Sequence, residues 1–253
     1  MKFSSPSIQF PENELAGLLD AAVPYVKKNR ASSAILYILF LIYFSFPSFN
    51  VPLLQYGHFR ITALMEQRAL EHNLKFYPEQ SWIGINDVNP MLLKGIISME
   101  DQSFFEHKGI DWVQLNKALK ENKRRGRVIR GGSTITMQLA KNMYLTTKRN
   151  VFRKAKELII TFRMEKELTK KEILQDYINA VEWGSGIFGI REAAEIYFHK
   201  EPANLTRTEC ARLAAVIPSP LKHSPVQNSG YVMRRTSIIL GRMNSVVLYP
   251  KKL

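Results

Sequence analysis

Signals for the start of a helix, each followed by apolar residues at helical spacing, recur from Pro90 towards the C-terminal end of the chain. Asn89 can cap a helix over residues 90–99, and Pro90 suits its first position. Thr169 and Thr206 are each followed three residues later by Glu, which is the pattern of a capping box. No stretch alternates apolar and polar residues over the length of a strand. The predicted fold class is therefore all-α.

The boundaries of the other predicted helices follow from capping residues and from the spacing of apolar residues. Helices are predicted over residues 111–122, from Ser133 to about Leu145, from Asn150 to about Glu167, after Thr169, after Thr206 until Pro218, and over residues 231–243. The sequence WGSGIFG, residues 183–189, is predicted as a loop. The single cysteine, Cys210, excludes an internal disulfide and a cysteine-rich metal site, and its apolar surroundings favour a small buried side chain.

Residues 31–49 carry no charge and, as a helix, would be about 28 Å long, close to the thickness of a bilayer core. The rival interpretation is a cleaved signal sequence, but bulky residues follow the apolar run where small ones are expected. Lys27, Lys28 and Arg30 precede the run, so the positive-inside rule places the rest of the chain outside the cytoplasm. The predicted organisation is a cytoplasmic tail (1–30), a transmembrane helix (31–49), a membrane-proximal segment (50–87) and a main domain (88–253).

The formal net charge of +14 indicates an anionic partner. Nucleic acid, an anionic membrane surface and a phosphorylated substrate all fit this charge, and charge alone does not choose among them. Hydrophobic residues make up 45% of the chain, which is enough for a substantial core.

Glu100 and Asp101 are adjacent carboxylates at the end of an apolar helical segment, and such groups are costly to bury. We interpret Glu100 as a general base at the mouth of a cleft. The alternative is a solvated acidic helix end flanked by the core residues Phe104 and Phe105. Clustered carboxylates are only probabilistic markers of a site, so this pair alone does not decide between the two interpretations.

Two later stretches supply groups that could bind an anion. Thr134, Gln138 and Lys141 are spaced by four and three, so they share one helix face, and a glycine-rich entry precedes them. Arg153 and Lys154 lie four and three residues before Glu157, so a helix gathers one carboxylate with two cations. Arg149 and Lys156 add further positive charge. A solvated face with ordinary surface ion pairs is the alternative for both stretches.

Five segments in this order resemble the motifs of the peptidoglycan glycosyltransferases: ISMEDQSFFEHKGID, RGGSTITMQLAKN, RKAKE, KKEILQDYINAVEWG and FGIREAAEIYFHK. The resemblance covers about residues 88–243. It implies a lysozyme-like domain that polymerises lipid II, and LAAVIPSPLKHSP with SGYVMRR is similar to the monofunctional biosynthetic transglycosylase branch. Because the sequence ends at Leu253, no transpeptidase domain is expected after this one. Met137 departs from the family, which has the first of two glutamines there.

The resemblance also implies roles for single residues. Glu100 would deprotonate the 4-hydroxyl of the acceptor sugar, and Glu157 would assist at the leaving side or hold a divalent cation, Mg²⁺ or Mn²⁺. The residues implied to contact the substrate, chiefly its diphosphate, are Asp101, Gln138, Lys141, Arg149, Arg153 and Lys154. The cations near Glu100 are expected to favour its ionised form.

The implied partners are lipid II, the growing undecaprenyl-diphosphate-linked glycan and the bilayer, with cell-wall synthesis or division proteins as further candidates and no nucleic acid. The implied location is the inner (cytoplasmic) membrane, with a single pass and the catalytic domain outside. Two alternatives stay open: a glycan-cleaving lysozyme-like enzyme with a protonated acid, and a non-catalytic, membrane-anchored basic protein that binds nucleic acid through KALKENKRRGRVIR.

Overall fold

The protein was analysed as a computed structural model, which describes residues 24, 28–44, 61–72, 81–127, 131–148 and 150–249. The chain divides into two compact units, Met1–Pro47 and Ser48–Leu253. In the first unit, the helix α2 (Arg30–Phe44) has 15 residues. Within the described ranges, no helix combines the length and apolar character needed to cross a bilayer. The transmembrane helix expected over residues 31–49 is therefore not shown, and its last five positions, 45–49, lie outside the described residues.

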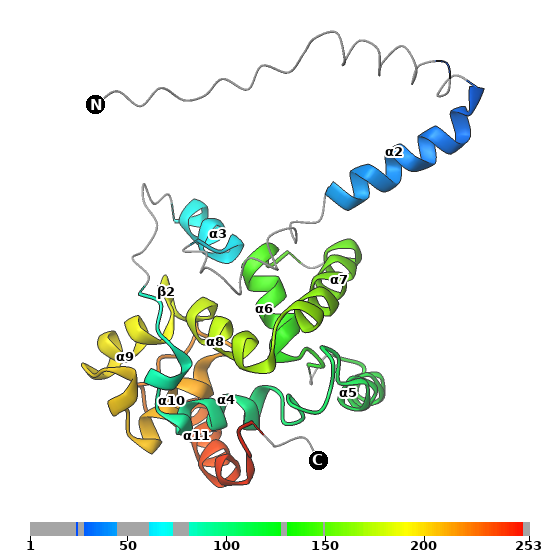
Figure 1. Cartoon of the computed structure of the whole chain (residues 1–253). Coiled ribbons are helices and arrows are strands. Elements are labelled where there is room, and N and C mark those ends of the chain that lie inside the picture. Colours follow the sequence, from blue (N-terminus) through cyan, green and yellow to red (C-terminus); the bar gives the residue numbers. More distant parts are fainter. Residues whose placement is uncertain are drawn as a thin grey trace, which may run out of the picture. The chain divides into compact units, whose positions relative to one another are not determined.

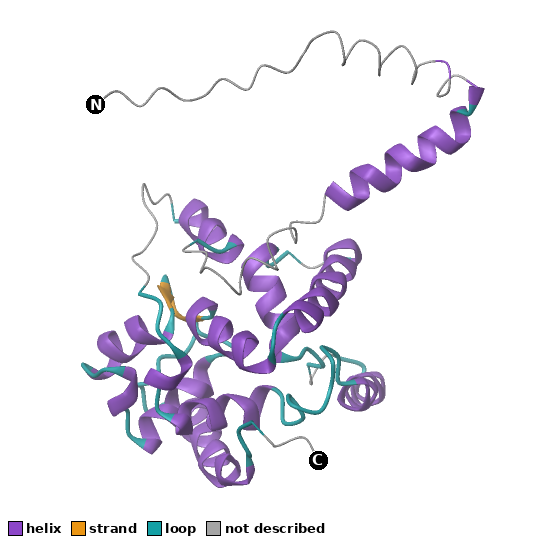
Figure 2. Ribbon diagram, viewed as in Figure 1, coloured by secondary structure: helices purple, strands orange, loops and turns teal. Residues whose placement is uncertain are grey.

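The second unit is built almost entirely from helices (Figures 1 and 2). Its α-helices are α3 (Ala63–Glu71), α4 (Pro90–Glu100), α5 (Trp112–Arg125), α6 (Ile135–Tyr144), α7 (Val151–Glu167), α8 (Lys170–Ala180), α9 (Ile190–Phe198), α10 (Arg207–Val216) and α11 (Gly230–Arg242). Short 3-10 helices are η2 (Ile85–Asp87), η3 (Pro202–Asn204) and η4 (Met243–Ser245). The prediction of a mostly helical fold is confirmed.

A small hairpin replaces the loop predicted over residues 183–189. Strand β1 (Glu182–Gly184) pairs antiparallel with β2 (Ile187–Phe188). The turn between them contains Gly186 at φ +71°, a left-handed conformation that glycine adopts without strain. Strands this short leave no alternating pattern in the sequence, so the prediction of a loop was wrong.

The predicted helix caps are largely confirmed. The Asn89 side chain accepts a hydrogen bond from the Met91 N–H at 2.9 Å, and Asn150 caps α7 in the same manner. Thr169 and Thr206 both form complete capping boxes. The cap of α6 is Thr134 and not Ser133, which leaves the Ser133 side chain free for another contact described below.

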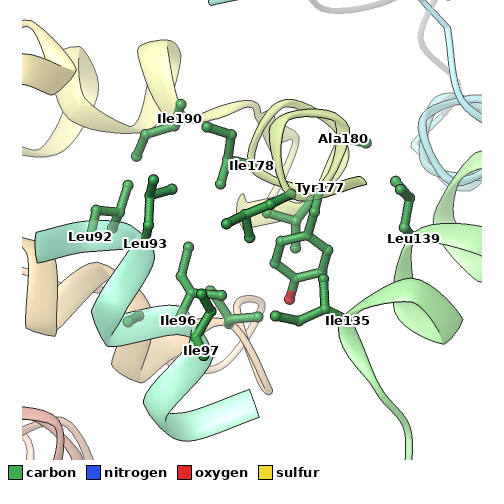
Figure 3. Close-up of a cluster of buried hydrophobic side chains, with 14 of the residues drawn as sticks. Leu92, Leu93, Ile96, Ile97, Ile135, Leu139, Tyr177, Ile178, Ala180 and Ile190 are labelled. Carbon is green, nitrogen blue, oxygen red and sulfur yellow. The ribbon is translucent and has the colours of Figure 1, made fainter. Parts of the chain in front are cut away.

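Helices α4, α6 and α8 pack together in the hydrophobic core. Figure 3 shows Leu92, Leu93, Ile96 and Ile97 of α4 facing Tyr177 and Ile178 of α8, with Ile135 and Leu139 of α6 beside them. All eight are buried. Close packing of this kind fixes the C-terminal end of α4 relative to the polar face of α6.

Helix α5 is confirmed, but it is mostly solvated. Of its residues only Ala118 is buried, whereas Trp112 is 61% and Leu119 58% exposed. Cys210, by contrast, is fully buried as expected, and burial raises the pKa of its thiol to about 12. A thiol with such a pKa is not reactive at neutral pH.

Candidate active site

Glu100 is the last residue of α4, and it opens onto a cavity of about 470 Å³. Its Oε2 atom accepts a hydrogen bond from Gln138 Nε2 of α6 at 3.0 Å. The Tyr177 hydroxyl of α8 donates to Gln138 Oε1 at 2.9 Å, which fixes the orientation of that amide. Three helices that share one core therefore hold the Glu100 carboxylate in place. The interpretation of Glu100 as a solvated helix end is wrong, since its side chain is only 12% exposed.

A positively charged side chain that was not predicted from the sequence, Arg235, lies beside Glu100. Arg235 Nη2 of α11 lies 3.4 Å from Glu100 Oε1, and Arg235 Nε donates to the Ala215 carbonyl at 3.0 Å. The guanidinium also lies over the ring of Tyr231, 5.5 Å from its centroid. The available signal was the SGYVMRR segment, which was interpreted as a mark of the monofunctional branch and as part of a helix, with no role assigned to Arg235.

The charge state of Glu100 follows from two opposing influences. Burial raises the pKa of its carboxyl above the ordinary value, while the Gln138 hydrogen bond and the charge of Arg235 lower it by less. The cations therefore favour the ionised form, as expected, but burial has the larger effect and the net direction of the pKa shift is upward. A base whose pKa lies closer to the working pH accepts a proton more readily, provided that it is ionised before the reaction.

Asp101 faces the protein interior, and both of its carboxylate oxygens have protein partners. Oδ1 lies 2.9 Å from His107 Nε2, and Oδ2 accepts a hydrogen bond from the Ile135 N–H at 3.0 Å. The second contact satisfies one of the free N–H groups at the start of α6. This geometry favours a role in positioning α6 over the substrate contact implied by the resemblance.

Glu157 of α7 is buried and paired with two cations. Arg153 Nη1 lies 2.6 Å from Glu157 Oε2, and Lys154 Nζ contacts Glu157 Oε1. Lys154 Nζ also donates to Ser133 Oγ at 3.3 Å, and Ser133 lines the same cavity as Glu100. Through Ser133, Lys154 thus reaches the edge of the Glu100 cavity, whereas Arg153 and Glu157 do not line it. Arg149 lies outside the described residues.

Lys141 of α6 interacts electrostatically with both Glu100 and Glu157. Burial lowers the pKa of its ammonium group, and the charge of Glu157 opposes that shift. Lys141 and Gln138 line a second cavity of about 360 Å³, and Gln138 and Pro218 line both cavities. Gln138 therefore lies at the junction of two adjoining hollows, one beside the candidate base and one beside the buried lysine.

The side chains around Glu157 do not fit a resident metal ion. Both of its oxygens are paired with cations, and no cluster of three or more His, Cys, Asp or Glu side chains suited to a metal occurs within the described ranges. Mg²⁺ and Mn²⁺ require several oxygen ligands. The described residues around Glu157 therefore do not form a resident site for the divalent cation that the resemblance implied.

Known proteins match most of the chain. The family model described as Transglycosylase matches residues 67–244. A biosynthetic peptidoglycan transglycosylase of Janthinobacterium sp. (strain Marseille) is 43% identical over 178 residues, covering 70% of this chain and 77% of that protein. Proteins of the same description from Laribacter hongkongensis (34% over 218 residues, 85% and 96% covered) and Shigella boydii serotype 4 (40% over 186 residues, 72% and 77% covered) match as well. This chain therefore belongs to the peptidoglycan transglycosylase family, whose members are glycosyltransferases that build peptidoglycan.

Proposed function

We propose that this glycosyltransferase polymerises glycan chains from lipid II, with Glu100 as the general base. The ionised Glu100 carboxylate takes the proton of the acceptor's 4-hydroxyl, and that oxygen attacks the anomeric carbon of the lipid-linked donor. The bond from this carbon to the diphosphate oxygen breaks, and undecaprenyl diphosphate leaves with the electron pair. Attack opposite the leaving group inverts the anomeric carbon and gives a β-1,4 link.

The observation that carries this proposal is the placement of a buried carboxylate and a cationic cluster at adjoining cavities. Gln138 and Arg235 orient Glu100, while Lys141 lies at the second cavity and Lys154 at the rim of the first. Fixed cations stabilise the charge that develops on a departing diphosphate without having to reorganise. Such a leaving group needs little help from a general acid.

Each remaining site residue has a part in this proposal. Arg153 and Lys154 are held by the buried Glu157, so we assign this carboxylate to orienting the cations at the leaving side. Arg149 is proposed as a further diphosphate contact on the basis of its motif alone. Asp101 acts through α6, because its oxygens already bind Ile135 and His107.

Membrane attachment is part of the same proposal. A lipid-linked donor lies in a bilayer, and residues 31–49 are an uncharged run that follows basic residues. We propose a single pass through the inner membrane, with the catalytic unit outside the cytoplasm and cell-wall synthesis or division proteins as neighbours. A reporter fused after Leu253 should be active only outside the cytoplasm. Cytoplasmic activity of that fusion would contradict this topology and revive the nucleic-acid-binding alternative.

The decisive experiment uses the full chain in lipid vesicles with purified lipid II, and separately with finished glycan. Polymerisation without glycan cleavage is expected. Glu100→Gln keeps the shape of the side chain and an oxygen for Gln138, yet it should lower turnover by at least about 100-fold, because it cannot accept the proton. Glu195→Gln, at a side chain that is 69% exposed, is the matched control and should behave as wild type.

Two outcomes would contradict the proposal. Substantial turnover by a folded Glu100→Gln variant would remove Glu100 from the role of base. Cleavage of finished glycan with no polymer formed from lipid II would assign the protein to the lysozyme-like alternative, in which the acid must be protonated.

A further inference from the structure

Helix α3 lies in the segment that was predicted to be only membrane-proximal, yet it makes a dense polar contact with the hairpin. Arg68 Nε lies 3.1 Å from both carboxylate oxygens of Glu182, and Arg68 Nη2 lies 3.0 Å from Glu182 Oε2. The Glu182 side chain is 4% exposed and that of Arg68 15%. Glu71 binds the remaining side of the guanidinium, with Arg68 Nη1 at 2.6 Å from its Oε2. Ion pairs with this multiple, part-buried geometry fix position more firmly than surface pairs do.

The same helix also holds the loop between α6 and α7. Gln67 Nε2 donates to Thr147 Oγ1 at 2.7 Å, and Gln67 Oε1 accepts a hydrogen bond from the Thr147 N–H at 2.9 Å. This loop leads into α7, the helix that carries Lys154 and Glu157. A separate buried cluster of Leu64, Met65 and Phe188 seats α3 on β2.

The contacts of α3 converge on the second cavity. Its lining includes Arg68, Gln138, Lys141, Thr147, Glu182 and Lys222. Arg68 is close enough to Lys141 for its charge to lower the pKa of that lysine further. Gly184 of β1 packs closely against Tyr197 of α9, since a Cβ on Gly184 would lie 2.0 Å from the Tyr197 hydroxyl. Glu182 itself lines this cavity, so the Arg68–Glu182 ion pair joins α3 directly to the cavity wall.

We propose that Arg68 is a positioning residue for the glycosyl transfer, and that α3 is a strap that holds the hairpin wall and the α6–α7 loop around the cavity at Lys141. Arg68 acts through Glu182 and does not itself take part in the chemistry. The strap sets how tightly the anionic part of the lipid-linked substrate is held. This inference rests on the proposed function, because it assigns that substrate to the cavity.

The test uses the full chain in vesicles with lipid II and measures KM and kcat separately. Arg68→Gln and Glu182→Gln should each raise KM for lipid II by roughly tenfold, the scale of one or two lost charge-assisted hydrogen bonds, with kcat nearly unchanged. The double variant should be no worse than either single variant, since the two residues act as one unit. Arg124→Gln is the control, because Arg124 forms a surface pair with Glu121 and is 68% exposed.

A folded Arg68→Gln variant with unchanged KM would overturn the inference, and so would a loss confined to kcat. If Arg68→Gln does not fold, Gln67→Ala decides, because it removes exposed contacts only, those to Thr147 and the hydrogen bond to Glu71, and leaves the Arg68–Glu182 pair in place. A raised KM in Gln67→Ala supports the strap, and an unchanged KM overturns it. Failure of the wild-type chain to polymerise lipid II would contradict the proposed function instead.

Discussion

Arg235 and Glu100 come from helices α11 and α4, and the Arg235 Nη2 atom lies 3.4 Å from Glu100 Oε1. The arginine cannot turn away freely, because its Nε donates to the Ala215 carbonyl. Burial and Arg235 have opposite effects on the carboxylate, since burial raises the pKa of Glu100 and the guanidinium lowers it. The arginine thus increases the fraction of Glu100 that is ionised at a given pH.

Replacing Arg235 should therefore move the pH dependence of the reaction. In Arg235→Gln the pKa of Glu100 loses a lowering influence and rises further. The acidic limb of the profile of kcat/KM against pH is expected to shift to higher pH, so the loss of activity is larger in mildly acidic buffer than in alkaline buffer. The measurement is initial polymerisation rate over a pH series at constant ionic strength.

Two further variants test this explanation. Arg235→Lys retains the positive charge and should restore part of the wild-type profile, whereas Arg234→Gln removes an exposed charge from the same helix and should leave the profile in place. An equal loss of activity by Arg235→Gln at every pH would mean that Arg235 has no influence on the titration of Glu100.

Lys154→Ala should weaken use of the lipid-linked donor more than it slows the chemical step. Lys154 contacts the buried Glu157 and donates to Ser133 at the rim of the Glu100 cavity. The side chain is 40% exposed, so salt screens its charge and the effect should shrink as ionic strength rises. We expect KM for lipid II to rise by about tenfold at low salt. Lys120→Ala, at an exposed position of α5, controls for the loss of a positive charge. An equal rise of KM in that variant would contradict a specific role for Lys154 in binding the donor.

Asp101 should prove important chiefly for stability. Asp101→Ala leaves the Ile135 N–H and His107 without their buried partner, and such losses typically cost about 1–3 kcal/mol of unfolding free energy. Asp101→Asn retains an oxygen for the N–H and should be destabilised less. Urea denaturation of the three proteins measures the difference. Wild-type stability of Asp101→Ala would favour the substrate contact that the family resemblance implied.

The sequence predicted those features that depend on neighbouring residues. The caps at Asn89, Asn150, Thr169 and Thr206 are local patterns of three or four residues, and the structure contains them all. The grouping of Arg153 and Lys154 around Glu157 was also foreseen, because one turn of a helix brings them together.

Contacts between segments that are far apart in the sequence could not be predicted from such local patterns. Arg235 and Glu100 are 135 residues apart, and Arg68 and Glu182 are 114 apart, so no spacing rule connects either pair. The burial that raises the pKa of Glu100 was missed for a related reason, since burial depends on the packing of several helices. Family motifs placed Glu100 and Gln138 in one site, but the Tyr177 hydroxyl that orients Gln138 came only from the structure.

Asp176 provides a prediction about stability that is independent of the reaction. This residue of α8 is 2% exposed, and burial, with a smaller contribution from the charge of Glu172, raises its pKa from 3.8 to about 7. Between these two values the folded chain binds more protons than the unfolded chain. The free energy of unfolding should therefore fall as the pH rises from about 4 to 7, by at most about 1.4 kcal/mol per pH unit from this one group.

Asp176→Asn removes the titration while keeping the size of the side chain. The variant should lose this part of the pH dependence, and it should be more stable than wild type at about pH 8, where the wild-type carboxylate is ionised and desolvated. Urea denaturation at several pH values and constant ionic strength measures both effects. Glu195→Gln, at an exposed carboxylate, should run parallel to wild type. If the Asp176→Asn curve also runs parallel to wild type, Asp176 has no raised pKa in the folded protein, because only a group that titrates differently in the two states contributes a slope.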